Sequence, residues 1–554
     1  MAKGEPARIS AAEAVFRTMA SLGCDTLFNL PGRGVYPLLN ELARVPHMGY
    51  VTAVHEAALA ACADGYARAR GDAAFLNIYM GSGTLNASSN LFLAQRDRVP
   101  LVVTATQTET WAVGADARAE ITDVLGAMRG VVKWAWEVPT PERIPEAIRR
   151  AYTIATTDPM GVTFLAIPID FWTEEISYLD QPLDTSSLPA SREYQGGDAV
   201  LDQLQRCERP AVVIGSDAIR KGCAAALVQL AEQAGALIFA EPDAARVPVA
   251  SAHPLYAGML DSSPDPATGA DFMLHVGVNT YMPEHEALFG KGCFHVWLGS
   301  DGHEANKVFA ADIQHVGEFE GIVQALAAGV SARAEKNPAW RAQRERAESV
   351  VRQQRAAWER DRTVESDGEP MTVATLFTIL RERLPADTVL VEQATTAARQ
   401  LHRYFPVPTE RHYFAASGSN QGWALGASAG VSLALRDKPV LMVTGDGGLM
   451  FGLQSLWTLA HYETPLIAVV LNNGGWNSMR QSVASGAQAV QGTVDRDYGW
   501  ASNYADVARA LGVRSARVES AEELDKVLAE SLPVEKPLFL DVAVQRVMRS
   551  PGGR

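Results

Sequence analysis

The chain has 554 residues, a length that suits about three or four domains, and its 49 lysines and arginines against 64 aspartates and glutamates leave a net charge of −15. This acidic balance makes nucleic acids and anionic membranes poor partners. The apolar runs are too short to cross a bilayer and the N-terminus carries no apolar signal core, so we expect a cytoplasmic protein without membrane contact. Five cysteines without CxxC spacing indicate structural thiols in a reducing compartment.

Residues 1–180 are predicted to form the first of three domains, each a doubly wound parallel α/β sheet, because apolar runs of strand length alternate with segments of helical spacing. The first helix is expected over residues 10–22, with Ser10 as its N-cap and Gly23 at its end. The strands are expected over residues 25–29, 50–54, 75–79, 101–105 and 162–169.

Glu56 lies where the strand over residues 50–54 gives way to a helix over residues 57–70. A carboxylate at this point can serve simply to favour the helix dipole. The alternative is a chemical role, and the neighbouring residues alone leave both roles open.

Residues 181–197 have the composition of a linker, and residues 198–334 show a second α/β pattern. Its strands are expected over residues 210–215, 236–239, 272–276, 295–298 and 314–316. The domain carries no glycine fingerprint that would demand a dinucleotide, which favours a structural role. His285 lies on the polar loop after the strand over residues 272–276, where a histidine is more often solvated than catalytic.

A charged helical connector over residues 335–363 leads to the third domain, residues 371–554. Its first strand, over residues 389–392, is followed by Thr395 and Thr396. Small hydroxyls at a strand end suit either the positioning of a phosphate or the N-cap of the next helix, and both roles stay open.

Two neighbouring strands of the third domain end in residues with oxygen ligands. The strands are expected over residues 439–444 and 465–471, followed by GDGG at 445–448 and NNGG at 472–475, with a helix over residues 452–462 between them. Parallel strands joined by a right-handed crossover present their carboxyl ends at one edge of the sheet, so Asp446 and Asn473 are expected to meet over a hard cation such as Mg²⁺. Gly447 and Gly448 would let backbone N–H groups approach an anion. Each half alone is also a common turn.

Together, at this spacing, the two halves resemble the diphosphate–magnesium motif of the thiamine-diphosphate (ThDP) enzymes. The resemblance implies that Asp446, the Asn473 side chain and the Gly475 carbonyl hold Mg²⁺. It also implies that residues of the first and third domains hold the coenzyme: Pro31, Gly32, Glu56, Thr395, Thr396, Gln421, Gly445, Gly447, Gly448, Asn473 and Trp476.

The segment around Glu56, VHEAALAACADGYARARG, is similar to the one that carries the catalytic glutamate in the decarboxylase and acetohydroxyacid synthase branch of this superfamily. The resemblance implies that Glu56 binds the pyrimidine ring of the coenzyme and exchanges a proton with it. In FNLPGRG, FLNIYMGSGTLNASSNLFLA and LVVTATQTE the first domain is closest in pattern to benzoylformate decarboxylase.

Some positions depart from the pattern of these relatives. Tyr79 and Arg33 stand where benzoylformate decarboxylase has an active-site histidine and a substrate-contacting serine. Gln421 stands where family members place a bulky apolar side chain under the thiazolium ring. His285 falls near a second active-site histidine of that enzyme, so Tyr79 and His285 join Glu56 as candidate catalytic residues.

The resemblance implies a ThDP- and Mg²⁺-dependent, non-oxidative decarboxylation of a 2-oxo acid through an enamine. The alternatives are a carboligase like acetolactate synthase, which passes the acyl group to an aldehyde or ketone acceptor, and a non-catalytic ThDP-binding relative. Because the two coenzyme-binding domains come from different subunits in this family, a homodimer at least, and commonly a homotetramer, is implied. In the synthases the middle domain holds FAD.

Five residues are candidates for substrate contact. Asn477, Ser478 and Met479 fall where family members touch their substrate. Arg33 and Arg118 suggest a second anionic group on the substrate, since guanidinium groups bind carboxylate and phosphate bidentately. Surface or interface salt bridges would explain the two arginines equally well.

Overall fold

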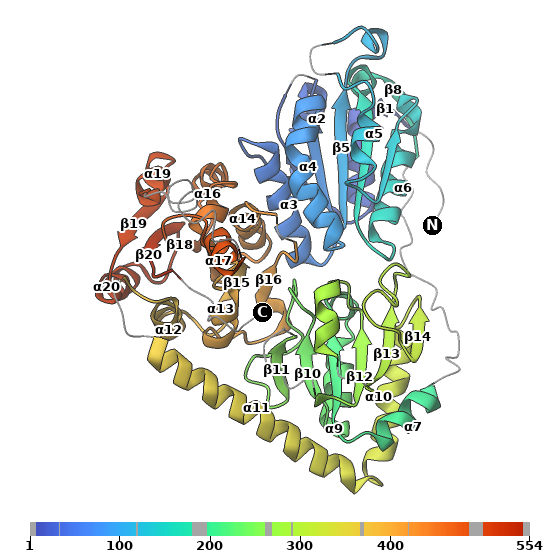
Figure 1. Cartoon of the computed structure of the whole chain (residues 1–554). Coiled ribbons are helices and arrows are strands. Elements are labelled where there is room, and N and C mark those ends of the chain that lie inside the picture. Colours follow the sequence, from blue (N-terminus) through green and yellow to red (C-terminus); the bar gives the residue numbers. More distant parts are fainter. Residues whose placement is uncertain are drawn as a thin grey trace.

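The computed structural model describes the chain except for residues 1–6, 33, 118–119, 180–196, 261–268, 290–291, 366–369, 419, 487–501 and 547–554. The described residues form three α/β units, each built on a six-stranded parallel sheet with flanking helices, which confirms the predicted fold class (Figure 1). The first unit (blue) lies at the top of the view, the second (green) at the lower right and the third (orange to red) at the left. The predicted domain boundaries at residues 180, 198 and 371 lie in or next to segments that the structure does not describe, so they stay predictions.

The first sheet has the strand order β3-β2-β4-β5-β7-β6, and all five predicted strands belong to it. Its elements are β2 (Thr26–Asn29), β3 (Gly49–Val51), β4 (Ala74–Tyr79), β5 (Leu101–Gln107), β6 (Trp134–Glu137), β7 (Val162–Pro168), α1 (Ala11–Ser21), α2 (Tyr36–Leu42), α3 (Glu56–Arg70), α4 (Gly81–Arg96) and α6 (Ile144–Thr156). Ser10 caps α1 as predicted, because its hydroxyl accepts the Glu13 N–H at 3.1 Å. The edge strand β6 was not predicted, since four partly exposed residues leave only a short apolar run.

The second sheet has the order β11-β10-β9-β12-β13-β14. Its elements are β9 (Pro210–Ile214), β10 (Leu237–Ala240), β11 (Tyr256–Met259), β12 (Phe272–Val276), β13 (Phe294–Gly299), β14 (Ile313–Val316), α7 (Gly197–Arg206), α8 (Ser216–Arg220), α9 (Ala224–Ala234) and α10 (Glu320–Ala334). The predicted charged connector is α11 (Pro338–Glu365), which runs along the bottom of Figure 1 from the second unit to the third.

The third sheet has the order β16-β15-β17-β18-β20-β19. Its elements are β15 (Val389–Gln393), β16 (Tyr413–Ala415), β17 (Val440–Gly445), β18 (Leu466–Asn472), β19 (Arg514–Val518), β20 (Leu538–Ala543), α12 (Val373–Arg383), α13 (Ala398–Tyr404), α14 (Ala424–Ala434), α15 (Asp446–Leu449), α16 (Ser455–Tyr462), α17 (Asn477–Gly486), α19 (Tyr504–Ala510) and α20 (Ala521–Ser531). The helix expected over residues 452–462 begins at Ser455, because the chain first makes the short helix α15 and a turn.

One hydrophobic core joins the first and third units within a single chain. Helices α3 and α14 meet there through glycines: a Cβ on Gly65 would lie 2.1 Å from the Ala427 carbonyl oxygen, and one on Gly430 would lie 1.9 Å from that of Cys62. Only glycine allows the two backbones to approach this closely. No helix in the described part of the chain combines the length and the apolar character needed to cross a membrane.

Candidate active site

The strands β17 and β18 bring the two halves of the glycine-rich motif to one edge of the third sheet. The strands pair in parallel, with Gly445 opposite Leu471, so the loops that follow them lie side by side. Asp446 is almost completely buried, and its Oδ2 accepts the Gly475 N–H at 2.8 Å. The structure thus joins the aspartate of one loop to the Gly475 N–H of the other, while a cation shared by Asp446 and Asn473 stays a prediction.

Burial raises the pKa of Asp446 to about 6, although the N–H groups of Gly475, Gly447 and Gly474 act to lower it. Gly474 and Gly475 have φ angles of 75° and 132°, a backbone region that favours glycine, and this turns the Gly475 N–H onto the carboxylate. The carboxylate is therefore held by backbone donors in a site that penalises its charge. A cation beside it would relieve that penalty.

The neighbouring oxygens fit a hard cation. The Oδ1 atom of Asn473 is buried and accepts no hydrogen bond within the described residues. The Gly475 carbonyl accepts the Asn477 N–H at 3.0 Å and keeps a second lone pair. No group of three or more histidine, cysteine, aspartate or glutamate side chains that could hold a metal occurs in the part of the chain that the structure describes. A carboxylate, an amide oxygen and a carbonyl are instead the mixed oxygen set that suits Mg²⁺.

Gly447 and Gly448 leave room for two side chains that lie over the start of α15. A Cβ on Gly447 would lie 2.3 Å from Cδ1 of Trp476, and one on Gly448 would lie 2.7 Å from Oε1 of Gln421. The predicted coenzyme residues Trp476 and Gln421 therefore lie directly against the motif. Asn477, Ser478 and Met479 follow at the start of α17, with Asn477 buried and Met479 exposed.

Thr395 and Thr396 lie in the turn between β15 and α13. The N-cap of α13 is Ala397, and no side-chain hydrogen bond caps this helix. Neither threonine is therefore the N-cap of α13, and the positioning of a phosphate by the two hydroxyls stays a prediction.

Gln393, at the end of β15, orders the loop that carries Gln421. Its Oε1 accepts the N–H groups of Gly422 and Trp423, both at 3.1 Å. The sequence did not point to this residue, since a glutamine at a strand end carries no signal for a contact 29 residues further along the chain.

A second group of predicted residues meets at the carboxyl edge of the first sheet. His55, not Glu56, caps α3, because its Nδ1 accepts the Ala57 N–H at 3.2 Å. The buried Glu56 side chain instead contacts α4: its Oε2 accepts a hydrogen bond from Nδ2 of Asn86 at 3.0 Å, and its Oε1 lies 2.8 Å from the position of a Cβ on Gly83. Gly83 and Asn86 lie one helical turn apart in the GSGTLN segment, and neither was predicted from the sequence as a site residue.

Tyr79 and Gly32 complete this group. Tyr79 ends β4, and its ring packs against the loop after β2, where a Cβ on Gly32 would lie 2.6 Å from Cδ2 of the ring. Pro31 precedes Gly32 in that loop. Four residues predicted to contact the coenzyme or the substrate therefore meet at one edge.

Within one chain, the segment before Glu56 contacts the third unit on the side away from the Asp446 loop. The backbone N–H of Thr52, just before Glu56, donates to the Tyr462 hydroxyl at 2.6 Å. Tyr462 ends α16 just before β18 begins, at the edge opposite the Asp446 loop.

His285 contacts residues of the second unit. It is buried in the second unit, its Nδ1 accepts the Met282 N–H at 3.0 Å, and its ring lies 6.3 Å from that of Tyr281. Arg33 and Arg118 lie outside the described residues.

Three family models match the chain in order. The N-terminal thiamine pyrophosphate (TPP) binding domain of the thiamine pyrophosphate enzymes matches residues 9–127, the central domain residues 198–326 and the C-terminal TPP binding domain residues 393–542. Thiamine pyrophosphate is another name for ThDP.

Two curated relatives and one solved structure illustrate the similarity. The chain is 26% identical to a benzoylformate decarboxylase of Pseudomonas aeruginosa, over 95% of this chain and 97% of that one. It is 27% identical to an acetolactate synthase large subunit of Parasynechococcus marenigrum, over 98% and 88%. A ThDP-dependent 4-hydroxybenzoylformate decarboxylase of Rhodococcus jostii RHA1 shares the fold, with a TM-score of 0.80 at 23% identity over 98% of this chain and 100% of that one. The chain belongs to the thiamine pyrophosphate enzymes, in the family that contains these decarboxylases and acetolactate synthases.

Proposed function

We propose that the protein is a Mg²⁺-dependent ThDP enzyme that releases CO₂ from a 2-oxo acid without oxidation, in the manner of a benzoylformate decarboxylase. The observation that carries this proposal is the buried Asn473 Oδ1, which accepts no hydrogen bond from the described residues and lies in the loop whose Gly475 N–H binds the buried Asp446 carboxylate. The similarity to a benzoylformate decarboxylase over nearly the whole chain supports the reaction class.

The residues of the third unit would bind the diphosphate end. Asp446, Asn473 and the Gly475 carbonyl would hold the metal. The backbone at Gly445 is open to an anion, because nothing lies within 4 Å of the position of a Cβ there, whereas Trp476 and Gln421 lie over Gly447 and Gly448. Thr395 and Thr396 would add hydroxyl donors, since neither caps α13. ThDP, when bound, supplies the electron sink for the pair of electrons released with CO₂.

The residues of the first unit would transfer a proton to and from the pyrimidine ring of the coenzyme. Glu56 would exchange it with a ring nitrogen of the pyrimidine through its carboxyl group. The Asn86 hydrogen bond fixes Oε2 of that group, and Gly83 leaves the space that Oε1 occupies. Pro31, Gly32 and Tyr79 would line the same pocket.

The proposal includes a homodimer at least, and a homotetramer as the common arrangement in the family. The bond from Thr52 to Tyr462 ties the strand before Glu56 to the edge opposite the metal loops, so a second copy is needed to bring a Glu56 to each Asp446. Large apolar side chains left exposed in one chain support a protein partner: Trp111 (79%), Tyr36 (69%) and Phe451 (56%).

A carboligase is the second candidate function, and the placement of His285 favours it. Release of an aldehyde requires a proton on the carbon that has lost CO₂, and this step needs a correctly placed acid side chain. The His285 ring is buried in the second unit and accepts the Met282 N–H, and Tyr79 stands where benzoylformate decarboxylase has its histidine. Transfer to a second carbonyl compound avoids that protonation step.

The deciding experiment measures CO₂ and product from a panel of 2-oxo acids, with and without an acceptor aldehyde, in ThDP and Mg²⁺. An aldehyde alone supports the decarboxylase, and a 2-hydroxyketone supports the carboligase. Glu56→Gln should abolish turnover, whereas Glu13→Gln, a surface change on α1, should not. If no 2-oxo acid is consumed, or if Glu56→Gln keeps full turnover, the proposal is refuted.

The substrate of this reaction would touch Asn477, Ser478 and Met479. Arg33 and Arg118 would bind a second anionic group on it. Comparing benzoylformate, pyruvate and dianionic 2-oxo acids in the wild type and in Arg33→Ala tests this point. Unchanged selectivity in the variant would end it.

A further inference from the structure

The second sheet has a topological switch point. From β9 the chain builds outward through β10 and β11 and then returns to place β12 on the other side of β9, next to β13 and β14. In open α/β sheets, ligands bind outside the carboxyl ends of the strands at such a point. The loops after β9 and β12 are therefore where a nucleotide would bind in this unit.

The backbones at this switch point leave no crevice between the two strands. A Cβ on Gly215, after β9, would lie 2.1 Å from the Gly277 carbonyl oxygen, and a Cβ on Gly277 would lie 2.4 Å from the Ala218 nitrogen. The two glycines therefore allow the loops to contact each other directly, and they leave no space for a ligand between them.

Glu241, at the end of β10, takes the donors that an anion would use. It is fully buried; its Oε1 accepts the Ser216 N–H at 2.7 Å, and its Oε2 accepts the Asn279 N–H at 2.9 Å and the Thr280 hydroxyl at 3.2 Å. Backbone N–H groups at strand and helix ends are the usual phosphate donors of nucleotide sites. A phosphate would have to displace a buried carboxyl group whose pKa burial raises to about 7.

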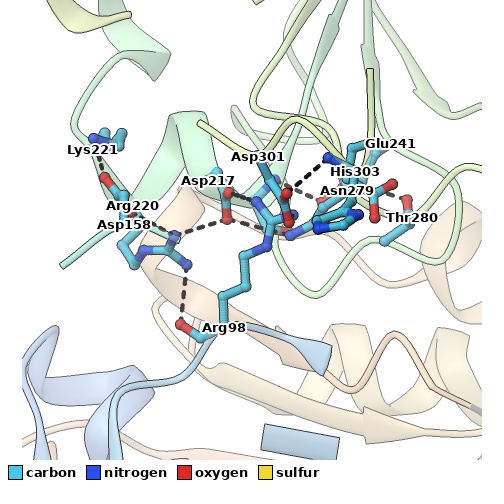
Figure 2. Close-up of polar contacts among 12 residues, drawn as sticks. Arg98, Asp158, Asp217, Arg220, Lys221, Glu241, Asn279, Thr280, Asp301 and His303 are labelled. Atoms are coloured by element: carbon cyan, nitrogen blue, oxygen red, sulfur yellow. Dashed lines mark hydrogen bonds and ion pairs between the residues drawn. The ribbon is translucent and has the colours of Figure 1, made fainter. Parts of the chain in front are cut away.

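Asp217, on α8, fills the rest of the switch point and binds a residue of the first unit. It is fully buried, forms an ion pair with Arg98, and accepts hydrogen bonds from Arg220 Nη2 at 2.8 Å and Asn279 Nδ2 at 3.3 Å. Figure 2 shows Arg98 reaching from the first unit (blue ribbon) to this group. The Nη2 atom of Arg98 also donates a hydrogen bond to Asp301, which follows β13, at 3.0 Å.

A second loop of the first unit strengthens the junction. Asp158, just before β7, pairs with Lys221, and Arg220 Nη1 donates to the Arg98 carbonyl at 3.5 Å. Arg98 and Asp158 both precede strands of the first sheet, so this junction lies at the edge opposite Glu56, which follows a strand.

We infer that the chain fills the ligand crevice of its middle unit with its own side chains, so that the crevice takes no nucleotide or dinucleotide and instead joins the middle unit to the first unit through Arg98. The residues present do not fit the FAD that the synthases hold in this domain, in agreement with the structural role that the sequence favours. The inference goes beyond the proposed reaction and holds whichever product the enzyme makes.

The ligand half of this inference is tested on the purified full-length protein with ThDP and Mg²⁺. FAD, NAD⁺ and ADP are added singly, and binding is measured by calorimetry and by flavin absorbance after gel filtration. We expect neither co-purified flavin nor saturable binding of any of the three. A stoichiometric flavin, or saturable binding at micromolar concentration that Glu241→Ala alters, would overturn the inference.

The junction half is tested by hydrogen–deuterium exchange on the same holoenzyme. Arg98→Ala leaves buried Asp217 without its cross-unit partner, so exchange of the backbone over residues 215–218 and 277–280 should accelerate by roughly tenfold or more. Arg150→Ala is the matched control, because Arg150 makes a half-exposed pair within its own helix. If Arg98→Ala exchanges like the control, the junction is refuted.

A milder variant covers the case in which Arg98→Ala does not fold. Asp301→Asn removes only the partly exposed end of the junction and keeps the Arg98–Asp217 pair. It should accelerate exchange over residues 299–303 severalfold without loss of the folded protein. Unchanged exchange in that loop would likewise count against the inference.

Discussion

Replacing Gly83 by alanine should lower activity and leave stability nearly unchanged. The new Cβ would lie 2.8 Å from Oε1 of Glu56, whereas ordinary van der Waals contact begins at 3.4 Å. The separation must therefore grow by about 0.6 Å. Because the carboxylate is the end of a flexible side chain, it will move before the backbone of α4 does.

The size of the effect follows from this displacement. A misplacement of about 1 Å in an active site costs on the order of a hundredfold in rate, so about 0.6 Å should lower kcat roughly tenfold. Alanine is favoured over glycine within a helix by ~0.8–1.0 kcal/mol, and this offsets part of the overpacking. We expect the free energy of unfolding to change by less than about 1 kcal/mol.

The assay compares kcat for CO₂ release and the apparent melting temperature of Gly83→Ala with those of the wild type. Gly321→Ala on α10 is the control, since nothing lies within 4 Å of its new Cβ. Full kcat in Gly83→Ala would refute the placement of Glu56. A loss of activity that only follows a fall in melting temperature would refute it too.

Three further predictions follow from the same geometry. Asn86→Ala removes the 3.0 Å bond to Glu56 and should lower kcat roughly tenfold or more with an unchanged melting temperature; unaltered kinetics would contradict the contact. Gly430→Ala places a Cβ 1.9 Å from a carbonyl of α3 and should destabilise the protein by about 1–3 kcal/mol or more in chemical denaturation, in contrast to Gly321→Ala. Because Asp446 has a pKa of about 6, protons compete with Mg²⁺ only below that pH, so metal titrations should show an affinity that is flat from pH 7 to 8 and falls up to tenfold per unit below about 6. An affinity independent of pH between 5 and 7 would contradict that assignment.

The sequence predicted the parts of the site that depend on strand ends. Asp446 and Asn473 follow buried apolar runs, and parallel pairing carries both runs to one edge whatever the rest of the chain does. The Glu56 segment was found by its resemblance to known enzymes. Local pattern alone could not decide between a helix-dipole role and a chemical one.

What the sequence did not predict depends on contacts between elements. Asn86 reaches Glu56 only because α4 packs beside α3, and Arg98 meets Asp217 only because two units dock. Neither contact leaves a periodic signal in the chain. The sequence could not decide whether Thr396 caps α13, because backbone angles determine that Ala397 is the N-cap.

The glycine contact between α3 and α14 has a consequence for biosynthesis. At about 5–20 residues per second, the roughly 350 residues between the two helices take on the order of 20–70 s to translate. Throughout that interval the face of α3 that carries Gly65 has no partner, so the nascent N-terminal third cannot reach its final form. The chain is therefore expected to depend on molecular chaperones until the ribosome has passed Ala434, and a truncated product that stops earlier is expected to aggregate.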